Sequence, residues 1–158
     1  MVFIGEGANL ETLKDEVRSL GLKNVLFLPY QPRDMLSFSL GMADLHIVPL
    51  KKGLAGTIVP SKVYGIMAAG RPFLAITDRG SEPARLIEEF GCGLWAAPGD
   101  RKAIAEKLSW ALTHREKLEE MGKIARRIAE IRFDKNVVMK EWLKVIDYSF
   151  SSTSGTIL

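Results

Sequence analysis

The chain has 158 residues, of which 47% are hydrophobic and 26% are charged. This apolar content is enough to bury a core and excludes an intrinsically disordered chain. The 22 basic and 19 acidic residues alternate along the sequence, so the formal charge of +3 predicts no nucleic-acid partner.

The first third of the chain alternates short apolar runs with amphipathic segments. Leucine and valine recur at spacings of three and four over residues 10–20, a period that predicts a helix, with Asn9 as its cap and Gly21 after its end. Pro32 opens a second helix. We predict strands at residues 2–4, 25–28 and 45–50, and helices at residues 10–20 and 32–41.

The remainder continues the alternation and then becomes helical. Pro60 and Gly70 delimit a short helix, and Asp134 is the predicted cap of the last one. The three tryptophans lie on apolar faces and are predicted to pack in the core. We predict strands at residues 73–76 and 94–97, helices at residues 61–69 and 82–90, and three further helices after Asp100.

Short strands that are apolar on both faces and separated by helices are typical of a parallel sheet covered on both sides. The sequence therefore predicts a doubly wound α/β domain of about five strands with carboxyl-terminal helices. Such sheets bind ligands at the carboxyl ends of the strands. We expect the site in the loops there, including residues 51–61 and 77–82.

The Gly5-Glu6-Gly7 turn stands where a dinucleotide-binding fingerprint would, between a strand and a helix. The third glycine of that fingerprint would fall on Leu10, and no acidic residue ends the second strand. We therefore interpret these glycines as a tight turn and predict no NAD or FAD binding.

The cysteines and histidines of the sequence are too few and too far apart to form a disulfide or a metal site. A single cysteine, Cys92, provides no disulfide and no cysteine zinc site, and His46 and His114 lie in different predicted elements. We expect no metal, no cofactor and a reducing, cytoplasmic location. No run of about 18 apolar residues occurs, so no membrane span is predicted.

The loop before the helix at residue 61 has the composition of an anion site. Gly53 and Gly56 allow close backbone approach, and the helix start directs the amides of Ser61 and Lys62 toward the loop, beside the Lys62 ammonium. The alternative interpretation is an ordinary helix start with a solvated lysine.

Four segments in order resemble the nucleotide-sugar-binding half of retaining GT-B glycosyltransferases of the glycosyl transferases group 1 family (family 4), especially its WbuB-type members. The segments are VPSKVYGIMAAGRPFLAI at residues 59–76, NVLFLPYQPRDML at 24–36, MADLHIVPL at 42–50 and GCGLWAAPGD at 91–100. The resemblance covers residues 2–148. We expect one domain over residues 1–148 and a flexible tail over 149–158.

The resemblance implies a donor-binding site for a nucleoside diphosphate sugar. Tyr30 would lie at the nucleobase, and the loop and helix start would face the sugar and phosphates. The predicted donor-binding residues are Gly5, Tyr30, Gly56, Thr57, Ser61 and Lys62. The family commonly has two glutamates where this chain has Thr57 and Gly65, so both carboxylates are missing; Glu82 is a weaker candidate whose charge suits a helix start.

The resemblance also implies a two-domain enzyme in which this chain supplies the donor half. The amino-terminal acceptor domain and the first strand of this domain are expected to be missing, and this fragment alone is expected to be inactive. No catalytic side chain is predicted here. The expected role is donor binding for a retaining transferase of surface polysaccharide or glycoconjugate synthesis.

Two alternatives from other classes are weighed against this role. One is a non-catalytic nucleotide-binding or interaction module with a degenerate donor site. The other is a receiver-type signalling domain, but this sequence lacks the acidic cluster that the phosphoacceptor site of such a domain needs. We also expect the gap left by the missing strand to close, so that residues 2–4 pair with residues 45–48; dimerisation through unpaired strands is the fallback.

Overall fold

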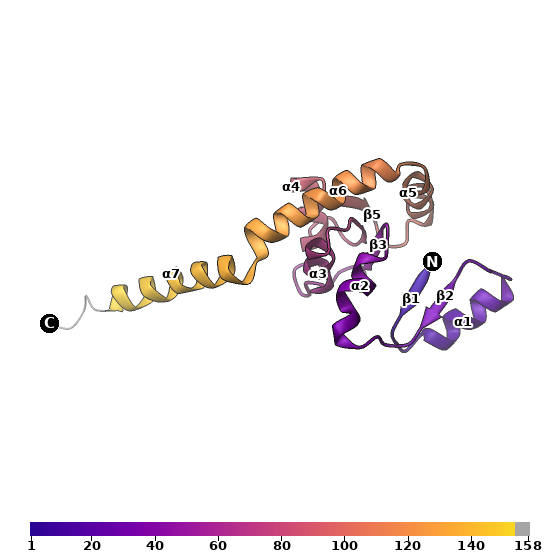
Figure 1. Cartoon of the computed structure of the whole chain (residues 1–158), viewed down its shortest axis with the longest axis horizontal. Coiled ribbons are helices and arrows are strands. Elements are labelled where there is room, and N and C mark those ends of the chain that lie inside the picture. Colours follow the sequence, from indigo (N-terminus) through magenta and orange to yellow (C-terminus); the bar gives the residue numbers. More distant parts are fainter. Residues whose placement is uncertain (154–158) are drawn as a thin grey trace. The chain divides into compact units, whose positions relative to one another are not determined.

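The computed structural model describes residues 1–153, with side chains up to residue 147. The chain divides into two compact units, Met1–Ser39 and a second unit that begins at Leu40. Figure 1 labels their elements in sequence order. The two units are described in turn.

The first unit is a small parallel pair of strands with one helix. Strand β1 (Val2–Ile4) pairs with β2 (Leu26–Leu28), and the Phe3 and Phe27 rings stack with centroids 5.2 Å apart. Every residue of this unit is described, and none of its side chains is fully buried. The other elements are α1 (Leu10–Ser19), η1 (Arg33–Met35) and α2 (Leu36–Gly41), which crosses into the second unit.

The second unit is a three-stranded parallel sheet with helices before and after it, which confirms the predicted α/β class. The strand order is β3-β4-β5, and Gly93 directly opposes Phe73. The strands are β3 (His46–Pro49), β4 (Phe73–Ile76) and β5 (Gly93–Ala96). The helices are α3 (Lys62–Ala68), α4 (Glu82–Phe90), α5 (Arg101–Thr113), α6 (Arg115–Ile128), the π-helical turn η2 (Ala129–Phe133) and α7 (Lys135–Thr153).

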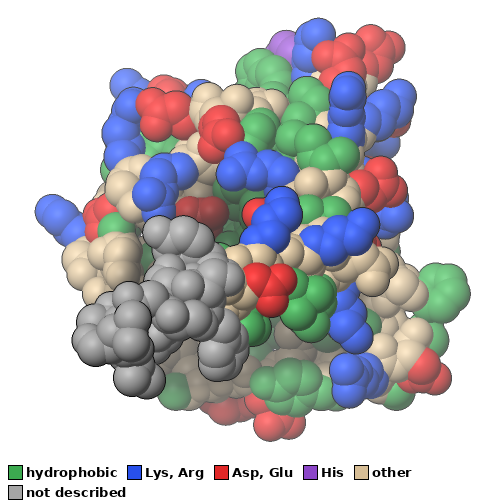
Figure 2. Space-filling model, turned by 90° about the vertical axis from the view of Figure 1, so that its left-hand side faces the viewer, with side chains coloured by type: hydrophobic (Ala, Val, Ile, Leu, Met, Phe, Trp, Pro, Cys, Tyr) green, Lys and Arg blue, Asp and Glu red, His purple; other side chains and the backbone are tan. Residues whose placement is uncertain are grey.

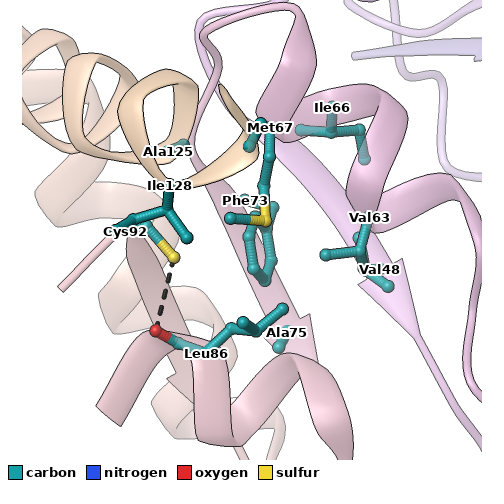
Figure 3. Close-up of a cluster of buried hydrophobic side chains, with 11 residues drawn as sticks. Val48, Val63, Ile66, Met67, Phe73, Ala75, Leu86, Cys92, Ala125 and Ile128 are labelled. Atoms are coloured by element: carbon teal, nitrogen blue, oxygen red, sulfur yellow. Dashed lines mark hydrogen bonds between the residues drawn. The ribbon is translucent and has the colours of Figure 1, made fainter. Parts of the chain in front are cut away.

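The core of this unit lies on both faces of the sheet because successive residues of a strand point to opposite faces. Phe73 and Ala75 pack in one cluster with residues of α3, α4 and α6, part of which is drawn in Figure 3. Leu74 lies in a second cluster with residues of α5, including Ala111. Helices therefore cover both faces of β4, as a doubly wound arrangement requires.

The expected pairing of residues 2–4 with residues 45–48 is wrong. Strands β1 and β2 form one sheet, and β3, β4 and β5 form another. That expectation assumed that the unpaired backbone N–H and C=O groups at the strand edges would be buried, which costs free energy. Val2 and Ile4 are instead 42% and 40% exposed, so β1 is not the buried strand on which that expectation depended.

Helix α7 departs from the prediction in two ways. It continues to Thr153, through the first five residues of the expected tail, while residues 154–158 lie outside the described residues. Trp142 was expected in the core and is 61% exposed, because α7 makes its main contacts with η2 and extends away from the sheet (Figure 1). Among the described residues, no helix is long and apolar enough to cross a membrane.

Candidate functional site

The predicted phosphate-facing loop lies at the carboxyl ends of β3 and β4. The Leu50 amide donates to the Ile76 carbonyl at 3.0 Å, which extends the pairing one step beyond the strands. After this point the chain turns at Gly53 and Gly56, whose φ angles are +84° and +80°. Both conformations favour glycine, so these residues define the path of the loop to α3.

The start of α3 leaves two backbone donors available. The Val63 amide donates to the Pro60 carbonyl at 3.1 Å, and the Tyr64 amide donates to the Ser61 carbonyl at 3.2 Å. Within the described part of the chain, the amides of Ser61 and Lys62 have no protein acceptor. The side chains of both residues are exposed, and the Ser61 hydroxyl makes no capping bond. A ligand anion at this loop would therefore find two amides, a hydroxyl and an ammonium.

The two positions that lack the family glutamates differ in their surroundings. Thr57 is exposed, and its amide donates to the Leu54 carbonyl at 3.2 Å. Gly65 lies inside α3, where a Cβ atom would be 3.3 Å from Leu40 Cδ1. The glycine at position 65 therefore makes room for Leu40, and no carboxylate stands there.

The turn after β4 contains an interaction that the sequence did not indicate. Asp78 Oδ2 accepts a hydrogen bond of 2.6 Å from the Gly53 amide, across 25 positions of sequence. The turn itself is anchored, because the buried Ser81 hydroxyl donates to Thr77 Oγ1 at 2.7 Å. The available signal was an aspartate two residues after a buried strand, in a loop already expected to border the site.

Two neighbours of this turn have clear local roles. Arg79 lies over the half-buried Trp95 ring, 4.8 Å from its centroid, and Trp95 Nε1 donates to the Thr77 carbonyl at 2.9 Å. Glu82 stands in the first turn of α4 and pairs with Arg85 at 3.1 Å. Burial raises the pKa of Tyr64, and the charge of Glu82 adds to that effect.

The first unit brings the other two predicted site residues together. Gly5 has a φ of +107°, and a Cβ atom there would lie 3.0 Å from Tyr30 Cε1. The Gly5 amide donates to the Leu28 carbonyl at 3.0 Å, which fixes the turn beside the ring. Tyr30 is 70% exposed, so most of its ring is available for stacking on a planar ligand.

The surroundings of His46 account for its lowered pKa. His46 Nε2 lies 2.8 Å from the Leu40 carbonyl oxygen, and burial lowers the pKa of His46, with the charges of Arg71 and Lys62 adding to the effect. Within residues 1–153, no group of His, Cys, Asp or Glu is placed to hold a metal ion. Figure 2 shows Lys and Arg side chains standing among Asp and Glu side chains on the face in view.

Comparison with known proteins supplies an independent line of evidence. The family described as Glycosyl transferases group 1 matches residues 1–128. WbjE of Pseudomonas aeruginosa, which is named as a glycosyltransferase, is 35% identical over 103 residues, covering 65% of this chain and 26% of WbjE. WcaI of Escherichia coli K12, which is named as a colanic acid biosynthesis glycosyl transferase, is 30% identical over 144 residues, covering 90% of this chain and 34% of WcaI.

Solved structures support the fold. HepE of Anabaena, whose structure was determined in complex with UDP-glucose, superposes with a TM-score of 0.72 at 20% identity, over 93% of this chain and 40% of HepE. The chain thus spans between about a quarter and two fifths of the length of these proteins.

Proposed function

The chain belongs to the glycosyl transferases group 1 family, and we propose that it forms the donor-binding half of a retaining glycosyltransferase that uses a nucleoside diphosphate sugar. The observation that carries this proposal is the start of α3. There, among the described residues, the Ser61 and Lys62 amides find no protein acceptor, and the Lys62 side chain is exposed. The UDP-glucose complex of HepE and the polysaccharide-related name of WcaI support the donor class and a role in surface polysaccharide or glycoconjugate synthesis.

In this proposal, Ser61 and Lys62 at the start of α3 stabilise the leaving group of the transfer reaction. When the bond between the sugar and the diphosphate breaks, negative charge develops on the departing oxygen. Amides and a cation fixed in place stabilise that charge without reorganising. Because α3 has only seven residues, the Lys62 charge contributes more than the helix dipole. The acceptor hydroxyl would be positioned by a separate amino-terminal domain.

An exposed apolar stripe on α7 supports the proposal of a second domain. Its apolar side chains recur at spacings of three and four and are all exposed. The stripe consists of Val138, Met139, Trp142, Leu143 and Ile146. An apolar surface of this kind on one helix marks a contact with another protein surface. We propose that the amino-terminal domain covers it, since the match to this chain takes up only 26% of WbjE and 34% of WcaI.

A second candidate function is nucleotide binding without sugar transfer. Thr57 and Gly65 favour it, because neither offers the carboxylate that the family commonly directs at the donor sugar and the ribose. Thr57 retains one hydroxyl for the sugar. The cytoplasm remains the proposed location because the chain has a single cysteine and so no disulfide of its own.

Calorimetric titration with UDP, GDP, ADP and their sugars tests the donor site. We expect weak binding of one nucleoside diphosphate, with amide shifts around Tyr30 and Ser61 in the NMR spectrum. Absence of both heat and shifts at millimolar ligand would contradict the site assignment.

A transfer assay separates the two functions. We expect the 158-residue chain alone to form no acceptor-dependent product, and the chain joined to the amino-terminal domain of its own gene to form it. Binding without transfer in the joined protein would favour the second candidate. Product from the chain alone would contradict the half-enzyme proposal.

A further inference from the structure

The loop that carries the proposed diphosphate site has few internal constraints. Its backbone hydrogen bonds are local and long: the Leu54 amide donates to the Lys51 carbonyl at 3.3 Å, and the Thr57 amide donates to the Leu54 carbonyl at 3.2 Å. Residues 51–53 and 56–59 are exposed. A loop with so little packing opens easily unless something outside it holds it.

The contact that holds it from outside is made by Asp78. Among the described residues, the 2.6 Å bond from the Gly53 amide to Asp78 Oδ2 is the only side-chain hydrogen bond to residues 51–61. A hydrogen bond to a charged group is about twice as strong as a neutral one. It is made at Gly53, where the positive φ begins the turn toward α3.

Asp78 is suited to this role because its own position is fixed by the core. The preceding residue, Thr77, is fully buried, and its amide donates to the Ala96 carbonyl at 3.2 Å. The Asp78 carbonyl accepts from the Ser81 amide at 3.0 Å, and Ser81 is also fully buried. The carboxylate thus connects a flexible loop to the end of the central strand β4.

We propose that Asp78 is a positioning residue that sets the loop leading to Ser61 and Lys62 in its ligand-binding conformation. The inference rests on the proposed donor site, and Asp78 acts through the loop without touching the donor. Removing the carboxylate leaves the folded core intact and lets the loop sample other conformations. The fraction of chains competent to bind then falls, and the apparent affinity falls with it.

The test compares Asp78→Ala, Asp78→Asn and the control Asp100→Ala in the 158-residue chain. Asp100 Oδ1 also accepts a backbone amide, that of Ala103 at 3.0 Å, in the loop after the neighbouring strand β5. The control therefore loses a similar bond away from residues 51–61. Two readouts are measured, namely hydrogen exchange of the Gly53 amide without ligand and the Kd for UDP, GDP or ADP, whichever binds.

We expect Asp78→Ala to accelerate exchange at Gly53 and to raise the diphosphate Kd about tenfold, with the Kd for the nucleoside unchanged. Asp78→Asn keeps an acceptor oxygen and should fall between the unsubstituted chain and Asp78→Ala, while Asp100→Ala should change neither readout.

Unchanged exchange at Gly53 in Asp78→Ala, or faster exchange with an unchanged diphosphate Kd, would overturn the inference. An equal loss of affinity for nucleoside and diphosphate would also overturn it, because that result indicates general damage. If the unsubstituted chain binds no nucleotide while Asp78→Ala still exposes Gly53, the donor site itself is wrong. The proposed positioning role is then refuted as well, and the result supports only the hydrogen bond between the Gly53 amide and Asp78.

Discussion

Replacing Lys62 by alanine measures how much the α3 start contributes to diphosphate binding. The Lys62 side chain is exposed, and the amides of Ser61 and Lys62 have no acceptor within the part of the chain that the structure describes. A hydrogen bond to a charged group contributes about 1.5 to 3 kcal/mol, and solvent exposure lowers that value. We therefore expect Lys62→Ala to weaken nucleoside diphosphate binding by about 1 to 2 kcal/mol, or roughly five- to thirty-fold in Kd.

The assay is calorimetric titration of the nucleoside diphosphate and of the matching nucleoside into each variant. Nucleoside binding should be unchanged because the nucleobase is expected at Tyr30. Lys52→Ala is the matched control, since Lys52 is an exposed lysine in the same loop, ten positions earlier. It should leave the diphosphate Kd within a factor of about two, because an isolated exposed charge contributes little.

Two results would refute this reasoning. An unchanged diphosphate Kd in Lys62→Ala means that the ammonium is solvated and that the anion lies elsewhere. An equal loss for nucleoside and diphosphate means that the substitution damages α3, which the thermal unfolding midpoint would reveal independently.

Three further predictions concern stability and reactivity. Gly93→Ala should lower the free energy of unfolding by about 3 kcal/mol or more in urea denaturation, because its Cβ atom would lie 2.2 Å from the Phe73 carbonyl oxygen; Gly80→Ala, with nothing within 4 Å, should cost less than about 0.5 kcal/mol. The Cys92 thiol should stay unreactive toward a chromogenic disulfide reagent until the chain unfolds, since burial raises its pKa to about 11, and rapid labelling of the folded chain would contradict this. Trp142→Ser should change the free energy of unfolding by less than about 0.5 kcal/mol, and a loss above about 1 kcal/mol would mean that α7 packs more tightly on its own unit than its exposure indicates.

The sequence predicted the elements of the second unit well where prolines, helix caps and glycines delimit them. Strand β4 and helix α4 have the predicted bounds because a proline precedes the strand, and because the N-cap Ser81 and Gly91, in the left-handed conformation, delimit the helix. In the first unit, Asn9 stands at the N-cap of α1 as predicted, yet its side chain makes no capping hydrogen bond. Local chemistry therefore located elements more reliably than it predicted individual contacts.

Features that depend on long-range placement were not predictable from local pattern. The bond between Gly53 and Asp78 joins residues 25 positions apart and depends on the register of two neighbouring strands. The burial of Trp142 was predicted from periodicity, which identifies an apolar face without identifying what covers it. The expectation of one closed sheet failed for a similar reason, since local pattern identifies strands without identifying which strands pair.

The close approach of Leu40 to Gly65 limits how this chain can acquire the glutamate that its family commonly has at that position. A glutamate at position 65 would crowd the Leu40 Cδ1 methyl group, which lies 3.3 Å from where its Cβ atom would be and would have to shift by a few tenths of an ångström. Shortening Leu40 to valine or alanine beforehand opens that space at the cost of some apolar packing. The order of the two changes therefore decides the intermediate: a route that begins with position 65 passes through one that is crowded at Leu40, whereas a route that begins with position 40 passes through one with looser apolar packing.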